Sequence, residues 1–207
     1  MGARISKIRL RIQGEQLISL LFLIGLLYQP LYSNSDPFST MVVSYEGSSF
    51  NALMAPANHY WNATQSNQIS LEFPFYWQFV NVQFQNSKFS GKTNNGTTSP
   101  DFEEYYIAIG WTAHWQLTDR VGVQTGFSLG DHSMFFPFES VRGQKNENEF
   151  GISLECLAYL NLIHGLRLQT SYSKNKVFTT TRFDHDSILF GLGYKMKTPQ
   201  FLMTFLK

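Results

Sequence analysis

The stretch EEYYIAIGWTAHWQL, residues 103–117, alternates two unlike sets of side chains over fifteen residues. The first set is mostly bulky and apolar: Tyr105, Ile107, Ile109, Trp111, Ala113, Trp115 and Leu117. The second set is small or polar: Glu104, Tyr106, Ala108, Gly110, Thr112, His114 and Gln116. A period of two is typical of a β-strand with two different faces, whereas a helix requires a period of about 3.6. The stretch therefore predicts one long strand.

The same alternation recurs in seven other segments, so eight strands are predicted. These segments are residues 41–48, 69–76, 80–85, 121–130, 150–156, 166–173 and 187–196. We expect strands of about 9–14 residues, which suits the roughly 9–11 residues of a transmembrane β-strand better than the 5–6 of a typical globular strand. Pro74 conflicts with this pattern because a closed barrel has no edge where its missing N–H is harmless, so we expect a β-bulge there.

The connections between these segments alternate in length. Short connections are expected around 77–79, 117–120 and 161–165, and longer polar ones at 51–67, 91–102, 132–147 and 176–183. Outer-membrane barrels combine short periplasmic turns with long external loops. The predicted fold class is therefore all-β: an eight-stranded antiparallel up-and-down transmembrane β-barrel. Because the strand count is even, both termini of the chain are expected on the short-turn, periplasmic side.

Composition excludes several other classes of protein. Of the 207 residues, 43% are hydrophobic, 16% aromatic and 15% charged, with a formal net charge of +1. Intrinsic disorder requires few aromatics and high charge, and a nucleic-acid binder would show an excess of basic residues. No apolar run approaches the roughly 20 residues of a membrane-spanning helix. Strands that are apolar at every second residue explain why the aromatic content is high although no apolar run is long enough for a membrane-spanning helix.

The N-terminal region has the three parts of an export signal. Its basic residues are Arg4, Lys7, Arg9 and Arg11. An apolar run follows over residues 17–28, which is long enough for a signal-peptide core and too short for a bilayer span. Ser33 and Ser35 come next and suit a signal peptidase. We therefore predict a cleaved signal peptide over residues 1–35 and a barrel over residues 36–196.

The alternation alone does not say which face is inside. A soluble lipocalin-type barrel also has eight strands, but its apolar face points inward. Here the polar face is rich in Gly and Ser, which suits a narrow interior, and the apolar face carries aromatics near strand ends. These aromatics are Tyr105, Trp115, Tyr172 and Tyr194. Because aromatic girdles mark the two membrane interfaces, the membrane barrel is favoured over the lipocalin.

This arrangement resembles the small eight-stranded outer-membrane barrels, the group of the outer membrane protein A membrane domain and its OmpX- and OmpW-like relatives. The segment GLGYKM, residues 191–196, is similar to the glycine-then-aromatic end that such barrels present to their assembly machinery. The resemblance implies a bacterial outer-membrane location, contact with membrane lipid and lipopolysaccharide, and insertion by the barrel-assembly machinery. The sequence departs from it in residues 197–207, a periplasmic tail or the end of the last strand, where Phe205 is an alternative assembly signal.

An eight-stranded barrel is barely wide enough for its own side chains, so the interior is predicted to be filled. The charged or titratable residues expected to face inward are Glu46, Glu72, Glu104, His114, Glu155, Arg167 and Lys195. Removing a charge from water costs several kcal/mol unless it is paired. We therefore predict a polar network in the lumen, with Glu155 and Arg167 on neighbouring strands as its main ion pair.

Three roles remain open at this point. The first is a structural or surface-interacting one, for which Met134, Phe135, Phe136 and Phe138 form a candidate loop patch that contacts a surface partner. The alternative is that these side chains fold back onto the barrel rim or lie in the lipid interface. The second is lipid A modification, because deacylases of this type use a His-x-Ser pair and a later Glu. His185 and Ser187 match the pair, but the alternation places both side chains on the inward face of the strand. No Glu follows Ser187 in the sequence. The third is a small-molecule conduit with a lateral opening.

No cofactor or metal site is predicted. The sequence has no Gly-rich phosphate loop and no zinc-type His or Cys motif.

Overall fold

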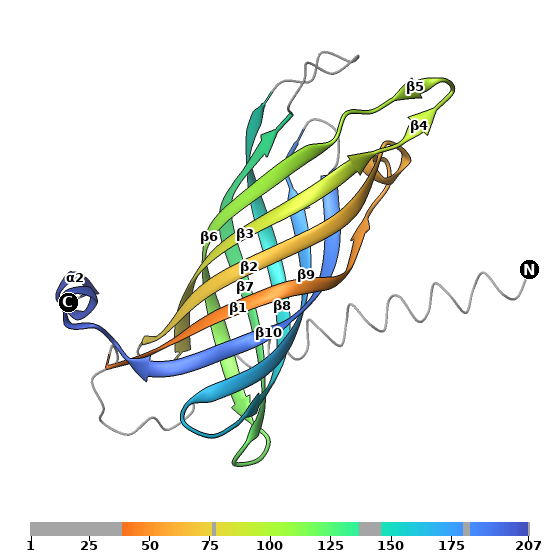
Figure 1. Ribbon diagram of the computed structural model, residues 1–207. Coiled ribbons are helices and arrows are strands. Elements are labelled where there is room, and N and C mark those ends of the chain that lie inside the picture. The colour runs from red at the N-terminus through yellow and green to blue at the C-terminus, as the bar shows by residue number, and fades with distance from the viewer. Residues whose placement is uncertain (1–38, 76–77, 137–145, 180–182, 207) are drawn as a thin grey trace, which may run out of the picture.

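The computed structural model describes residues 39–75, 78–136, 146–179 and 183–206, and it is a closed antiparallel barrel of eight strands (Figure 1). Around the barrel the strands follow the order β1-β10-β9-β8-β7-β6-β3-β2, so neighbours in the barrel are also neighbours in the chain. The first and last strands, β1 and β10, pair to close it. The predicted fold class is confirmed, whereas the predicted signal peptide lies outside the described residues.

The barrel strands are 12 to 15 residues long. They are β1 (Thr40–Leu53), β2 (Trp61–Phe75), β3 (Gln78–Gly91), β6 (Phe102–Gln116), β7 (Val121–Phe135), β8 (Glu147–Asn161), β9 (Leu166–Val177) and β10 (Phe183–Lys197). The other elements are the 3-10 turn η1 (Ala57–His59), the small hairpin of β4 (Thr93–Asn94) and β5 (Thr97–Thr98), and the helix α2 (Gln200–Leu206).

The long connections are shorter than the sequence pattern predicts. Residues 51–67 were expected to form a loop, but β1 runs to Leu53 and β2 begins at Trp61. These added strand residues are polar on the outside, as in the run from Asn62 to Asn67, so the apolar alternation that marks a strand inside lipid is missing from them. A strand that continues above the membrane therefore resembles a loop in sequence.

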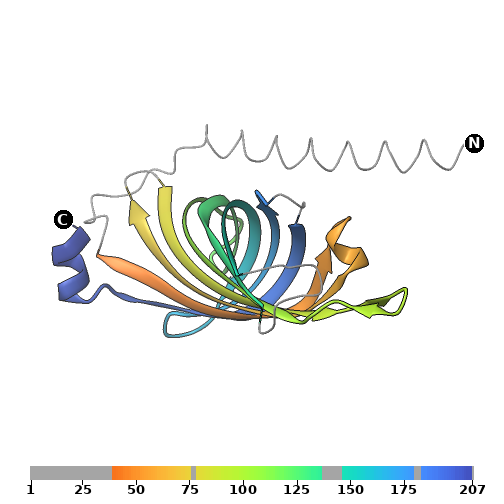
Figure 2. The same cartoon turned by 90° about the horizontal axis from the view of Figure 1, so that it is seen from above.

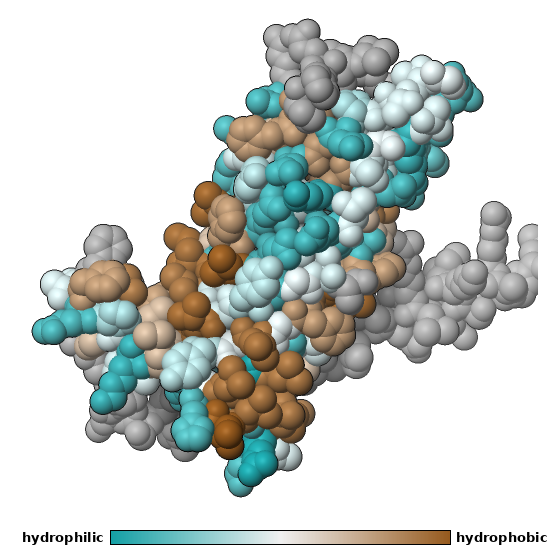
Figure 3. Space-filling model, in the orientation of Figure 1, coloured by the Kyte–Doolittle hydropathy of each residue, from teal (hydrophilic) through white to brown (hydrophobic). Residues whose placement is uncertain are grey.

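The apolar face of the strands points outward, which contradicts the lipocalin alternative. Ile107, Phe150 and Phe190 are all more than half exposed, while inward residues such as Ser44, Gln83 and Gln169 are buried. We call this outward apolar surface the apolar belt. Figure 3 shows apolar side chains gathered on the lower part of the barrel and hydrophilic ones above it. Within the described part of the chain, no helix is long and apolar enough to cross a membrane.

Pro74 does not lie in a bulge, so that expectation was wrong. Pro74 pairs in register with Phe79 of β3, and the irregularity of the β2–β3 ladder lies between Ala63 and Gln65 instead. On the other side of β2, the ladder with β1 ends at Glu72. Because Pro74 lies beyond that end, its missing N–H interrupts no bond to β1.

The closing strand ends at Lys197, and the chain then forms α2. Phe205 therefore belongs to the helix and not to the closing strand. The backbone N–H of Thr198 donates to the carbonyl of Ser39 (3.1 Å), which ties the end of β10 to the start of β1.

Candidate functional site in the barrel interior

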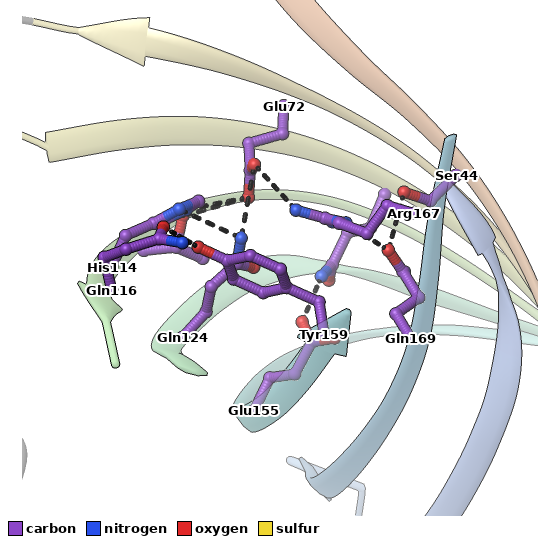
Figure 4. Close-up of polar contacts among 11 residues, drawn as sticks. Ser44, Glu72, His114, Gln116, Gln124, Glu155, Tyr159, Arg167 and Gln169 are labelled. Carbon is purple, nitrogen blue, oxygen red and sulfur yellow. Dashed lines mark hydrogen bonds and ion pairs between the residues drawn. The ribbon is translucent and has the colours of Figure 1, made fainter. Parts of the chain in front are cut away.

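The half of the lumen nearer the short turns is organised around Glu72 of β2 (Figure 4). Its carboxylate lies 3.7 Å from Nη1 of Arg167 on β9 and 3.1 Å from Nε2 of His114 on β6. Gln124 of β7 bridges this group when its amide nitrogen faces Glu72 (3.3 Å) and its oxygen faces Arg167 (3.0 Å). Four strands thus place one carboxylate, one guanidinium, one imidazole and one amide around a single point.

The Arg167 side chain has further partners besides Glu72. Its Nε donates to Oε1 of Gln169 (2.7 Å), and its guanidinium lies 4.9 Å from the ring centroid of Tyr159. The Tyr159 hydroxyl in turn donates to Oε1 of Gln116 (3.1 Å), and the Ser44 hydroxyl donates to Gln169 (3.3 Å). The side chain of Arg167 is only 7% exposed. A buried cation with this many partners is locked in one orientation.

The predicted ion pair between Glu155 and Arg167 does not form. In the β8–β9 ladder Glu155 lies opposite Ser173, whereas Arg167 lies opposite Asn161. The separation along the strands leaves Arg167 to reach Glu72 instead, and Glu155 accepts a hydrogen bond from Nε2 of Gln83 (2.6 Å). The alternation correctly predicted that both side chains face inward. It carries no information about how far neighbouring strands are shifted along one another, and this shift decides which inward residues meet.

Glu46 and Lys195 complete the predicted set of lumenal residues. Glu46 is 1% exposed and accepts a hydrogen bond from the Ser171 hydroxyl (3.2 Å). Lys195 is exposed and takes no part in the network, because the end of β10 extends past β9, whose ladder stops at Tyr194. Among the buried charged residues of the described chain, the acids therefore outnumber the bases, and Arg167 is the only buried Lys or Arg.

A second polar cluster occupies the half of the lumen nearer the long loops. Nδ1 of His132 lies 2.7 Å from one carboxylate oxygen of Glu104, and Nε2 of His185 lies 3.7 Å from the other. The His132 ring stacks on Tyr106 with centroids 4.2 Å apart. Glu104, His132 and His185 are each at most 1% exposed. Two histidines thus share one carboxylate away from water.

Sequence reasoning missed His132 because it assigned this residue to a loop. The strand β7 continues to Phe135, and His132 has the same inward parity as Ser128 and Met134. Its outward neighbours Asp131 and Ser133 are polar, so the apolar half of the pattern ends before the strand does. If the alternation had been continued beyond the last apolar residue of the pattern, it would have placed His132 on the inward face.

An apolar cluster, which we call the plug, lies beside the two histidines at the long-loop end of the barrel. Its buried members are Leu53, Ala57, Trp61, Phe89, Phe102, Met134, Val177 and Phe183. Phe102 is at its centre, with ring centroids 4.6 Å from Phe89 and 5.4 Å from Trp61. The ring of His185 lies 5.9 Å from that of Phe89, so the plug rests directly on the histidine cluster.

The predicted loop patch does not exist as one surface. Met134 is 4% exposed and belongs to the plug, and Phe136 packs against the plug from the loop side. Phe135 has the opposite parity and is 46% exposed on the outer wall, where its ring lies 5.6 Å from Tyr105. Phe138 lies outside the described residues. The interpretation in which these aromatics fold back onto the rim holds for Met134 and Phe136.

On the outer wall, below the long loops, lies a groove of about 710 Å³ that includes Phe135 in its lining. Nζ of Lys88 and Oε1 of Glu103 form an ion pair there (3.3 Å), and the Tyr105 hydroxyl donates to the same carboxylate (2.9 Å). Asn146 contributes from the loop after β7 and accepts a hydrogen bond from the N–H of Phe136. The groove therefore combines one exposed aromatic ring, that of Phe135, and the half-buried ring of Tyr105 with a neutralised pair of charges.

The interior offers little to a lipid substrate. His185 and Ser187 face inward, as their parity predicts, and Ser187 has no exposed surface. A lipid in the bilayer cannot reach its hydroxyl without opening the barrel wall. Within the described residues, no group of three or more His, Cys, Asp or Glu side chains is placed to hold a metal ion.

The acidic residue of the histidine cluster gives a direct test of these contacts. We expect Glu104→Gln to lower the free energy of unfolding by about 1.5–3 kcal/mol, the usual value for a hydrogen bond to a charged group. Glu103→Gln is a matched control, because Glu103 is adjacent in sequence, faces outward and should change stability by less than about 1 kcal/mol. Chemical unfolding of the refolded protein, followed by tryptophan fluorescence, measures both. Equal effects would contradict the cluster.

No protein-family model and no curated protein matches this sequence. Several solved structures have the same fold. Neisserial surface protein A is 14% identical, with 76% of this chain and 97% of that chain covered and a TM-score of 0.57. Ail, the attachment invasion locus protein of Yersinia pestis, is 12% identical, with 77% and 99% covered and a TM-score of 0.51. A major outer membrane protein from Thermus thermophilus is 11% identical, with 76% and 100% covered and a TM-score of 0.51.

These likenesses and the outward apolar belt define the class of protein: a transmembrane β-barrel. More particularly, the chain has the fold of the small eight-stranded barrels of the bacterial outer membrane.

Proposed function

We propose that this protein resides in the bacterial outer membrane as a closed barrel and that it acts through its outer rim, without passing solutes through its interior. The observation that carries the proposal is that three layers of side chains follow one another along the axis of the barrel. The Glu72 network lies at one end, Glu104 and its histidines lie further along, and the plug around Phe102 covers them.

Both kinds of layer oppose passage through the barrel. An ion would have to leave water to pass the apolar side chains of the plug, and an unpaired charge in such surroundings costs many kcal/mol. The polar layers are occupied by side chains that already bind one another, as Arg167 does with Glu72, Gln169 and Tyr159. Eight strands leave no spare width around them.

The outer rim offers the surfaces that a partner could touch. The β4–β5 hairpin projects beyond the end of the barrel (Figure 1), and the described residues from Thr93 to Thr98 are exposed. The groove beside Phe135 lies on the wall just below the loops. Lipopolysaccharide and surface partners are the ligands we propose for this rim. One similarly folded protein, Ail, is an attachment protein by its name.

A conduit with a lateral opening is the second candidate, and one observation favours it. The β1–β2 ladder covers only Val42–Gly47, much less than the β6–β7 ladder, which runs from Glu103 to Gln116. The gap is bridged, however, by a hydrogen bond from the N–H of Ser66 to Oγ of Ser48 (2.8 Å). Side chains of the plug fill the space inside it, so we prefer the closed barrel.

Conductance measurements test the closure. We expect the purified protein to insert into planar bilayers without producing regular single-channel steps, because the plug and the network block the lumen. A variant in which Phe89 and Phe102 are both replaced by alanine serves as the comparison, since it removes the stacked centre of the plug. Regular steps from the unaltered protein would contradict the proposal.

The same proposal makes a claim about the rim. We expect Phe135→Ser, combined with replacement of residues 93–98 by Gly-Ser, to reduce adherence of expressing bacteria to cultured epithelial cells at least fivefold. Asp119→Ser, in the exposed turn at the opposite end of the barrel, is the control and should leave adherence unchanged. A heat-dependent gel shift confirms that each variant is folded. Full adherence by the folded rim variant would remove the surface role.

A further inference from the structure

The helix α2 is apolar, yet it has no extensive packing against any barrel strand in the described structure. Five of the seven residues in its sequence, QFLMTFL, are large and apolar. Phe201 is 73% exposed, close to the highest exposure of any large apolar side chain described. Exposed apolar surface of this kind usually marks a contact with something else.

The position of α2 indicates what that contact is. The helix stands to the side of the barrel wall, past the end of β10, and does not lie beneath the barrel opening (Figures 1 and 2). The outward side chains that lead to it along β10 are Leu192, Tyr194 and Met196, which are 51%, 49% and 36% exposed. The apolar belt is therefore continuous with the helix, and whatever surrounds the belt also reaches α2.

Charge at the same place favours a lipid surface over a protein core. Lys195 and Lys197 are both exposed, and they alternate with Tyr194 and Met196 in the last four residues of β10, just before α2. Lysines near the ends of membrane segments extend their ammonium groups to the headgroup region, where anionic lipids attract them. Tyr194 beside them is a residue type that concentrates at this depth.

We propose that α2 lies in the headgroup region of the leaflet on the short-turn side of the barrel. Its apolar side chains enter the acyl boundary, and Lys195 and Lys197 contact the phosphates of anionic phospholipids. An amphipathic segment lying in the plane of the interface buries apolar surface without crossing the membrane. This inference rests on the proposed function to the extent that the barrel must be in a membrane.

Depth-dependent fluorescence quenching tests the proposal on the full chain. In a Cys156→Ser background, three single-cysteine variants are labelled with an environment-sensitive fluorophore: Phe201→Cys on α2, Leu192→Cys in the apolar belt and Asp119→Cys in the exposed β6–β7 turn at the same end of the barrel. The protein is refolded into vesicles of phosphatidylethanolamine and phosphatidylglycerol that contain lipids spin-labelled near the headgroup or deep in the acyl chain.

We expect the Phe201 probe to lose at least half of its emission with the headgroup label and less with the deep label. The Leu192 probe should respond more to the deep label, and the Asp119 probe to neither. Lys195→Gln combined with Lys197→Gln should shift the Phe201 probe toward the aqueous response, by at least twofold in quenching, in anionic vesicles but not in zwitterionic ones.

Three results would overturn the inference. A Phe201 probe that behaves like the Asp119 probe places α2 in water. Self-quenching between labelled copies that grows with the protein-to-lipid ratio places it against a second copy. A Leu192 probe that no lipid label quenches means that the barrel is not in the membrane, and this outcome alone also removes the proposed function.

Discussion

We expect Arg167→Ala to lower the free energy of unfolding by about 3–5 kcal/mol, the usual cost of removing one partner from a buried ion pair. Arg167 is the only Lys or Arg buried in the described part of the barrel, and Glu72 faces it at 3.7 Å. Its loss leaves the Glu72 carboxylate with His114, Gln124 and the Thr112 hydroxyl, none of which is a permanent cation. It also removes the contacts that Gln169 and Tyr159 make with the guanidinium. Chemical unfolding in lipid vesicles measures the change.

Two further variants show whether the loss comes from the ion pair. Arg167→Leu combined with Glu72→Gln removes both charges, so we expect it to recover at least half of the stability lost in Arg167→Ala. Lys195→Ala is the control, because Lys195 is exposed and its replacement should cost less than about 0.5 kcal/mol. If the double variant is no more stable than Arg167→Ala, an unpaired Glu72 is not the cause.

We expect a similar loss, about 3–5 kcal/mol, from Phe102→Ala at the centre of the plug. The Phe102 side chain is 2% exposed and its ring lies against those of Phe89, Trp61, Phe136 and Phe183, so truncation leaves a cavity that no single neighbour can fill. Because the Phe102 ring contacts residues of β2, β3 and β10, we expect its removal to loosen the packing at the long-loop end as well. Unfolding curves and the temperature of the gel shift should both move.

Phe150→Ala is the matched control for the plug. Phe150 is a phenylalanine on the outer wall and is 53% exposed, so alanine there removes contact with the surroundings without opening an internal cavity. We expect it to cost less than half of what Phe102→Ala costs. Phe102→Leu should fall between the two, since leucine keeps part of the volume. A plug variant as stable as the Phe150 variant would mean that the cluster does not hold the rim together.

Alternation predicted the architecture well because it is a local property of each strand. Glu46, Glu104 and Arg167 face the lumen, and Ile107 and Phe190 face outward, as parity requires. The strand ends were predicted less well, since strands that continue above the apolar belt lose their apolar half. This is why His132 and Met134 were assigned to a loop and not to β7.

The sequence by itself determined the number of strands, their antiparallel order and the face on which each side chain lies. The period of two and the lengths of the connections are local features that can be read directly from the order of the residues. Only the tertiary structure decided which lumenal residues meet. Closing the barrel sets the stagger between strands, and that stagger places Arg167 against Glu72 instead of Glu155 and brings Glu104 to His132 and His185. It also gathers aromatic residues from both halves of the chain into one plug around Phe102. These contacts join residues far apart in the sequence, and alternation holds no information about the stagger that brings them together.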